Sequence, residues 1–327
     1  MKRRQFITLL GGAAAAWPLL AHAQQPAMPV IGFLYSGSLA PIANSVSAFR
    51  KGLSEMGYTE GQNVAFEFRS AENDNARLPE LAAELVRRQV AVIATPGSPV
   101  AAGAAKAATT TIPVVFGTGL DPVQAGLVAS LGRPGGNITG VSTMNAELWG
   151  KRLGLLLELV PGARRVAMLV NLNSPTTAAI IADVRAVSAS LGRQVEIVQA
   201  NTSHEIDAAI ASSVQKQADA LLVGTGPPFA QRRVQLATLT ARHAVPAMFA
   251  DRQYVEAGGL TSYGSSVTDM YRQVGIYTGR ILKGEKPTEL PVLQAAKFEL
   301  IINLHTAGLL GLEVPPTLLA RADEVIE

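Results

Sequence analysis

Residues 90–119 read VAVIATPGSPVAAGAAKAATTTIPVVFGTG, and this stretch decides the fold class. Two short apolar runs, 90–96 and 112–118, are bounded by Gly, Pro and Thr, which is typical of buried strands. The small-residue stretch 99–108 between them predicts a helix. A helix between two strands is the crossover of a parallel sheet that is covered on both faces.

The same order of elements recurs in the second half of the chain. Residues 112–116 (IPVVF) correspond to residues 245–249 (VPAMF), and each run follows a strand, a Gly/Pro-rich loop and a small-residue helix. Coincidence in an alanine-rich α/β chain is the alternative. A repeat indicates two similar lobes of doubly wound topology.

The alternation of strands and helices continues outward in both directions. Strands are predicted at 30–36, 64–70, 138–143, 165–171, 194–200, 218–225, 245–251, 260–264 and 297–303, and helices at 42–56, 78–88, 146–160, 175–191, 205–217, 229–243, 267–283 and 305–310.

The predicted fold class is therefore α/β, with two doubly wound parallel-sheet lobes joined by a hinge. We expect the N-terminal lobe to span 29–141 plus about 263–288, and the C-terminal lobe to span 142–262 plus about 289–327.

Composition excludes several classes of protein. The 327 residues include no cysteine, which excludes disulfides, iron–sulfur clusters, thiolate zinc sites and cysteine nucleophiles. The net charge of +3 comes from 28 basic and 25 acidic residues, and Lys2, Arg3 and Arg4 supply the excess. Without these three residues the chain has 25 basic and 25 acidic residues, and this balance removes the case for binding nucleic acid or an anionic membrane.

The first 23 residues have the organisation of an export signal. Lys2-Arg3-Arg4 precede the apolar stretch 6–20, and Ala21-His22-Ala23 form a small-x-small cleavage pattern. The alternative is an uncleaved membrane anchor, for which the apolar run is short. Arg3-Arg4 resemble a twin-arginine signal, with ordinary secretory export as the alternative. We therefore expect a periplasmic protein with no membrane insertion after cleavage.

In open parallel sheets, ligands bind beyond the carboxyl ends of the strands. The loops at these ends are rich in hydroxyl, amide and glycine groups, which suit a small-molecule ligand in a cleft between the lobes. The alternative for each residue is an N-cap or a turn position. The candidate ligand-binding residues are Tyr35, Ser36, Ser38, Thr95, Gly97, Ser98, Thr118, Asp121, Asn173, Thr225 and Asp251.

Two acidic candidates have structural alternatives. Asp121 precedes Pro122, an arrangement typical of helix initiation, and contact with a ligand ammonium group is the second interpretation. Asp251 has a similar place in the second lobe. Aromatic residues at or near strand ends are either pocket walls or core: Tyr35, Phe116, Phe229, Phe249 and Tyr263.

The sequence does not favour an enzyme. His204, His243 and His305 lie in separate predicted elements without metal-ligand spacing. We find no G-x-S-x-G elbow, P-loop or dinucleotide fingerprint. We therefore expect no catalytic residues, no metal and no cofactor.

Several motifs resemble one family. They are the Phe49-Arg50-Lys51-Gly52-Leu53 helix, the run Asp121-Pro122-Val123-Gln124-Ala125-Gly126-Leu127-Val128, and Gly136-Asn137-Ile138-Thr139-Gly140-Val141-Ser142. With these motifs, the chain from Val30 to Pro316 resembles the ABC transporter substrate-binding proteins of the tryptophan/tyrosine-binding type, which have a type I periplasmic binding fold.

The resemblance implies a monomeric protein that captures a small solute and delivers it to an ABC permease and its ATPase. A ligand-sensing subunit for a histidine kinase or chemoreceptor is the alternative. Two loops depart from the family: Asn-Ser-Glu is replaced by Asn173-Ser174-Pro175, and Pro-Thr-Asp-Asn by Gly226-Pro227-Pro228-Phe229. The lost acidic and amide groups leave two solute classes open, an amino acid or an aromatic carboxylate.

Overall fold

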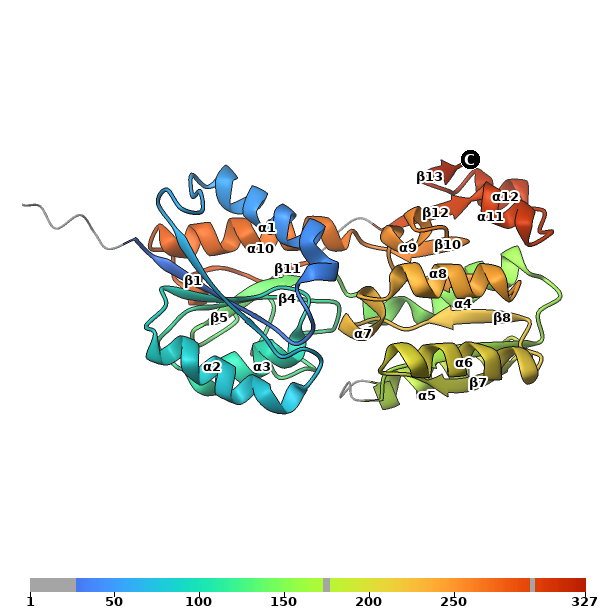
Figure 1. The fold of residues 1–327 in the computed structure, drawn as a ribbon, viewed down its shortest axis with the longest axis horizontal. Helices are drawn as coiled ribbons and strands as arrows, with labels where there is room; N and C mark the ends of the chain where they lie inside the picture. The colour runs from blue at the N-terminus through green and yellow to red at the C-terminus, as the bar shows by residue number, and fades with distance from the viewer. Residues whose placement is uncertain (1–27, 173–176, 295–297) are drawn as a thin grey trace, which may run out of the picture.

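The computed structural model describes residues 28–172, 177–294 and 298–327. The predicted signal at 1–23 and the candidate residue Asn173 lie outside this part of the chain. Figure 1 shows two lobes side by side along the long axis, each with a central sheet between helices.

The first lobe contains a six-stranded parallel sheet of order β11-β5-β4-β3-β1-β2. Its strands are β1 (Val30–Tyr35), β2 (Ala65–Ser70), β3 (Val92–Thr95), β4 (Val114–Thr118), β5 (Ile138–Ser142) and β11 (Leu293–Gln294). The stretch that opened the sequence analysis forms β3, α3 (Pro99–Ala108) and β4, as its pattern predicts.

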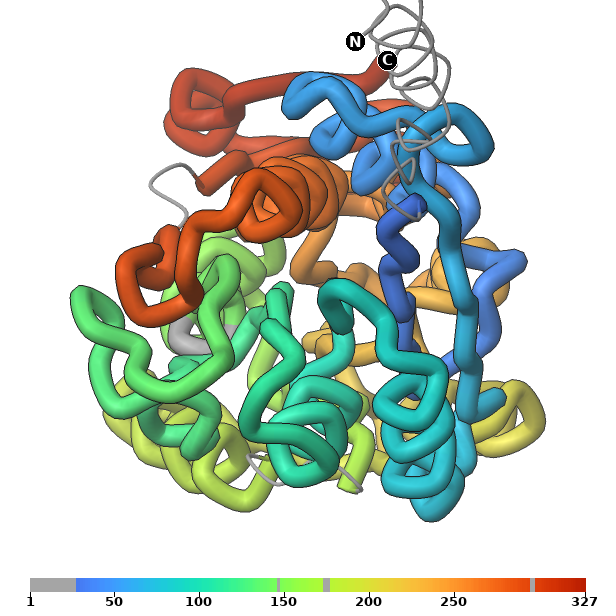
Figure 2. The backbone as a smooth tube through the Cα atoms, turned by 90° about the vertical axis from the view of Figure 1, so that its left-hand side faces the viewer, coloured from blue at the N-terminus to red at the C-terminus, as the bar shows by residue number. Residues whose placement is uncertain are grey.

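Helices cover both faces of this sheet because its strands are apolar on both sides. Helices α1 (Ala43–Glu55) and α10 (Val267–Leu282) pack on one face, against Ile31, Phe33 and Val115. On the other face, α2 (Leu78–Arg87) and α3 pack against Leu34 and Phe116. Figure 2 shows α10 beside α1 on one side of the lobe and α2 with α3 on the other, so a late segment of the chain completes the first lobe.

The second lobe contains a seven-stranded sheet of order β13-β12-β10-β9-β8-β6-β7. Its strands are β6 (Arg165–Val170), β7 (Gln194–Gln199), β8 (Ala220–Val223), β9 (Ala247–Phe249), β10 (Thr261–Gly264), β12 (Glu299–Asn303) and β13 (Glu324–Ile326). All neighbours are parallel except β10 and β12. Its helices are α4 (Trp149–Leu159), α5 (Thr177–Ser190), α6 (Ser203–Gln215), α7 (Pro227–Ala230), α8 (Arg233–Arg242), α9 (Arg252–Glu256), α11 (Leu304–Leu309) and α12 (Pro316–Leu319).

One local expectation is wrong. The helix expected at 229–243 is two helices, α7 and α8, because Pro227 and Pro228 start a separate short turn of helix. Strands β11 and β13 are too short to give a sequence pattern. Strand β11 pairs with β5, so the chain returns to the sheet of the first lobe at 293–294.

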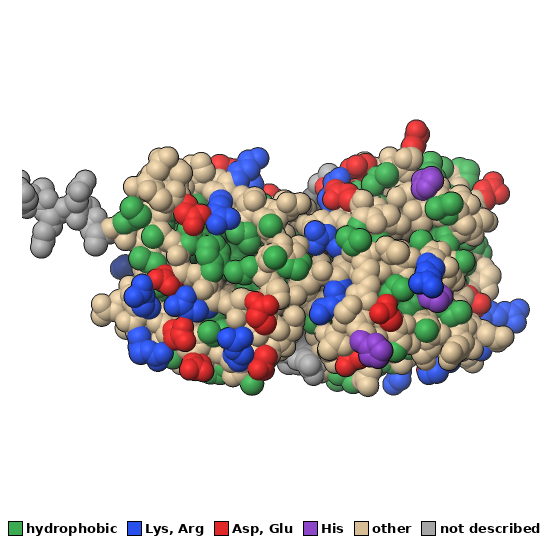
Figure 3. All heavy atoms as spheres, viewed as in Figure 1, with side chains coloured by type: hydrophobic (Ala, Val, Ile, Leu, Met, Phe, Trp, Pro, Cys, Tyr) green, Lys and Arg blue, Asp and Glu red, His purple; other side chains and the backbone are tan. Residues whose placement is uncertain are grey.

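Charged side chains show no segregation on the face in Figure 3, where acidic and basic residues are interspersed over both lobes. No helix in the described residues is long and apolar enough to cross a membrane.

Helices α1 and α10 approach so closely that glycine is required at their contact. A Cβ atom added to Gly275 would lie 2.1 Å from the backbone oxygen of Phe49, and one added to Gly52 would lie 1.9 Å from that of Arg272. Neither clash can be relieved by a side-chain rotation, because the contacted atoms belong to the backbone.

We expect Gly275→Ala to lower the free energy of unfolding by about 1–3 kcal/mol, because the added methyl group forces the two helices apart. Urea unfolding measures this change. Gly103→Ala in α3 is the matched control: its Cβ would meet nothing within 4 Å, so the higher helix propensity of alanine should stabilise it by up to about 1 kcal/mol. Equal destabilisation by both substitutions would contradict the packing argument.

Candidate functional site

A cavity of about 190 Å³ lies between the lobes, which is far more than one water molecule requires. Residues that follow the carboxyl ends of strands line it from both sides. Ser36 and Gly97 come from the first lobe, and Asn201, Thr225 and Asp251 come from the second. The position agrees with the general rule for ligand sites in open parallel sheets.

Five of the eleven candidate residues line this cavity: Tyr35, Ser36, Gly97, Thr225 and Asp251. Five others lie outside its lining: Ser38, Thr95, Ser98, Thr118 and Asp121. Asn173 lies outside the described residues.

The hydroxyl groups outside the lining support the loops around the cavity. The Ser98 side chain caps α3 by accepting from the backbone N–H of Ala101 at 3.4 Å, and it donates to Ser36 Oγ at 2.9 Å. The Thr118 hydroxyl accepts from the N–H of Leu120 at 3.0 Å, and Ser38 bonds to Glu72. Thr95 is fully buried, and its Oγ1 has no partner within the described structure.

Asp121 holds a turn. Its Oδ1 accepts from the backbone N–H groups of Val123 at 2.8 Å and Gln124 at 3.3 Å. These contacts match the capping interpretation. The expected helix after Pro122 is replaced by turns, in which the carbonyl groups of residues 121–123 accept from the N–H groups of residues 125–128.

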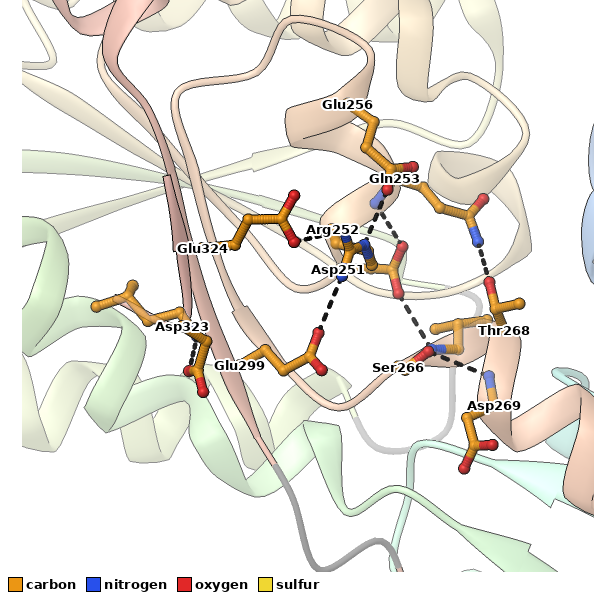
Figure 4. Close-up of polar contacts among 12 residues, drawn as sticks. Asp251, Arg252, Gln253, Glu256, Ser266, Thr268, Asp269, Glu299, Asp323 and Glu324 are labelled. Atoms are coloured by element: carbon orange, nitrogen blue, oxygen red, sulfur yellow. Dashed lines mark hydrogen bonds and ion pairs between the residues drawn. The ribbon is translucent and has the colours of Figure 1, made fainter. Parts of the chain in front are cut away.

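Asp251 joins a helix of the second lobe to the start of a helix of the first lobe. Its Oδ1 accepts from Gln253 N–H at 2.9 Å and caps α9, and its Oδ2 accepts from Val267 N–H at 3.2 Å at the start of α10 (Figure 4). The carboxyl group is almost fully buried, and desolvation raises its pKa above the ordinary value. Next to it, Arg252 forms ion pairs with Glu256, Glu299 and Glu324.

Tyrosines form most of the aromatic wall. Tyr35, Tyr254 and Tyr271 line the cavity. The Tyr35 hydroxyl bonds to Tyr271 and Gln231, and burial raises the Tyr35 pKa to about 12, so this phenol is neutral at pH 7. Phe116, Phe229 and Phe249 are fully buried in the lobes instead, and Tyr263 is outside the lining.

Direct contacts join the lobes beside the cavity. The amides of Asn73 and Gln231 form a reciprocal pair at 3.3 and 3.2 Å, and Arg233 Nη1 donates to the Pro41 carbonyl at 3.0 Å. A Cβ at Gly37 would lie 1.7 Å from Gln231 Nε2, so a larger residue there would displace the Gln231 amide. The sequence does not indicate Gln231 and Arg233 as site residues, because the pattern of a helical segment does not show which of its residues face an opposite lobe.

The hinge contains a fully buried arginine. The chain passes between the lobes three times, and two of these passages, at 143–148 and 265–266, lie wholly within the described residues. Arg152 in α4 donates from Nε to the Tyr263 carbonyl at 2.7 Å, and from Nη1 to the Asn145 carbonyl at 2.8 Å. Asn145 Oδ1 in turn accepts from Ser265 N–H at 3.0 Å. Arg152 and Asn145 thus tie the two passages together.

Burial lowers the pKa of Arg152 to about 9, so the guanidinium remains charged at neutral pH. Arg152 also forms a cation–π contact with Trp149: its guanidinium carbon lies 5.3 Å from the centroid of the Trp149 ring.

Comparison with known proteins assigns the family. The ABC transporter substrate binding protein family matches residues 30–326. The chain belongs to this family. Its relatives are substrate-binding proteins, in agreement with the expectation that the chain is not an enzyme.

Three relatives illustrate the range of this substrate-binding protein's neighbours. The tyrosine-binding protein of Clostridioides difficile is 28% identical over 265 residues, which cover 81% of this chain and 76% of the relative. A Streptococcus pneumoniae ABC domain solved with L-Trp has a TM-score of 0.81 at 26% identity. A ligand-free, open structure of a Clostridium difficile substrate-binding protein has a TM-score of 0.62, also at 26% identity. Both structural matches cover 91% of this chain and 99% of the other.

The two TM-scores concern the same share of this chain. The backbone of this substrate-binding protein as a whole therefore superposes better on the L-Trp complex than on the open structure. The type I periplasmic binding fold is confirmed by these neighbours.

We expect Arg152→Met to lower the free energy of unfolding by at least about 2 kcal/mol, because it leaves buried carbonyl groups of Tyr263 and Asn145 without donors. Chemical unfolding of the whole protein measures the change. The control is Arg280→Met, which removes an arginine that forms a partly exposed ion pair with Glu285 and should cost less than about 1 kcal/mol. Similar losses in both variants would show that Arg152 has no special role in the hinge.

Proposed function

We propose that this protein is the periplasmic solute-binding component of an ABC importer, and that it holds one small solute in the cavity between its lobes. The observation that carries the proposal is the cavity itself, because residues at the strand ends of both lobes line it and the lobes also contact each other beside it. A solute in this position is buried by closure and touches both lobes.

The lining indicates a solute with an apolar or aromatic body and a few polar groups. Tyr35, Tyr254, Tyr271, Ile42 and Leu120 supply the apolar surface. The relatives that bind tyrosine and L-Trp support an aromatic solute. Export through the expected signal at 1–23 would place the protein in the periplasm, where it would deliver its solute to a permease and its ATPase.

A binding protein that closes on its solute gains stability from the solute, because the ligand binds the folded state and not the unfolded chain. We expect a library of amino acids and aromatic and aliphatic carboxylates, tested by thermal shift, to contain at least one compound that raises the Tm. At 100 times its Kd, such a compound should stabilise the protein by about 2.7 kcal/mol.

Mass spectrometry of the protein purified under native conditions complements the screen by identifying a solute that co-purifies. A screen in which no compound raises the Tm, together with the absence of any co-purified solute, would contradict the proposed function.

A further inference from the structure

Arg233 is the only basic residue among the described residues that line the cavity. Arg233 lines the cavity and is partly buried; its Nη1 donates to the carbonyl groups of Pro41 at 3.0 Å and Ala230 at 3.2 Å. Among the described residues, no carboxylate forms an ion pair with it. The guanidinium therefore brings a positive charge to the cavity, and its remaining N–H groups are suited to a carboxylate.

Asp251 is the only carboxylate among the described residues that line the cavity. Each of its oxygens already accepts a backbone N–H, from Gln253 and from Val267. Its charge also interacts with the buried guanidinium of Arg152. Asp251 is therefore held by backbone N–H groups and by Arg152, and Arg233 is the charged lining residue that has no carboxylate partner within the described structure.

Two described loops of the second lobe that contribute to the lining supply no other acidic group. Residues 199–202 read QANT and residues 224–229 read GTGPPF, so neither loop contains Asp or Glu. A ligand ammonium group would be desolvated in the cavity, where the only carboxylate among the described lining residues already accepts a backbone N–H at each oxygen. Burying a charge without a counter-charge is costly, so the site disfavours a zwitterion.

We propose that the solute is a monocarboxylate without an ammonium group and that Arg233 binds its carboxylate. This inference rests on the proposed function and specifies the class of solute. The apolar body lies against Tyr35, Tyr254 and Tyr271. The side-chain oxygen of Asn201, which lines the cavity and has no partner within the described structure, accepts a hydrogen bond from a neutral hydroxyl or N–H group of the solute.

Arg233 also links the charge of the solute to closure. It comes from α8 of the second lobe, yet its Nη1 bonds to Pro41 of the first. A carboxylate on the same guanidinium stabilises that side chain in the position that bridges the lobes. The solute therefore strengthens an existing contact between the lobes.

Matched pairs of compounds test the inference by isothermal titration calorimetry on the full protein. The pairs are 3-phenylpropionate with L-phenylalanine, 3-(4-hydroxyphenyl)propionate with L-tyrosine, and indole-3-propionate with L-tryptophan, and members of a pair differ in the α-ammonium group. We expect at least one acid to bind, with a Kd at least about tenfold lower than that of its amino acid.

Two variants locate the carboxylate. Arg233→Gln should weaken binding of that acid by at least about tenfold, because it removes charge-assisted hydrogen bonds. Arg242→Gln removes the same charge from the exposed far end of the same helix and should change the Kd less than twofold. Circular dichroism and the Tm establish that both variants are folded.

An amino acid that binds as tightly as its matched acid overturns the inference and leaves the proposed function intact. Acid binding that is unaffected by Arg233→Gln overturns the role of Arg233. If none of the three acids binds, the inference is wrong. The proposed function is tested separately, by the thermal-shift library and by mass spectrometry of co-purified solutes.

Discussion

The guanidinium of Arg152 bonds to two of the three chain passages that connect the lobes, and the geometry of the cavity depends on this contact. Asn145 and Tyr263 stand at the ends of these passages, and both give their carbonyl groups to the same fully buried side chain. Because the donors of arginine are held in one plane, they fix the spacing of the passages as well as satisfying their polar groups. The lobes can then move about a hinge without the passages separating.

The polar contacts beside the cavity join residues far apart in sequence, because each contact connects one lobe to the other. The Asn73–Gln231 amide pair and the bond from Arg233 to Pro41 each connect one lobe to the other. Each amide–amide or guanidinium–carbonyl contact replaces bonds to water and contributes little by itself. A solute that contacts both lobes adds the apolar burial that these polar bonds lack, so closure and binding support each other.

The sequence predicts the parts of this architecture that have a local pattern. Residues 90–119 form a strand, a helix and a strand, because small and β-branched residues there follow the periods of these elements. Strand β11 has two residues and no pattern, so its pairing with β5 cannot be read from sequence. The separate short helix α7 has a local cause in Pro227 and Pro228, which start it just before the segment expected to be one helix.

The residues of the candidate site also divide into those that a sequence pattern indicates and those that it does not. Ser36, Gly97 and Asp251 follow strands, so the rule for parallel sheets finds them. Ser98 and Thr118 also follow strands, yet they bond to the backbone of their own loops, because a hydroxyl group suits a cap as well as a ligand. Tyr271 and Arg233 lie within helices and reach the cavity only because the lobes face each other.

The most direct test of the account is a crystal structure of the protein with the tightest-binding solute from the screen. The account predicts one solute in the cavity between closed lobes, with contacts to Tyr35 from the first lobe and to Arg233 from the second. A solute bound to one lobe alone, with the lobes apart and Arg233 away from Pro41, would contradict it.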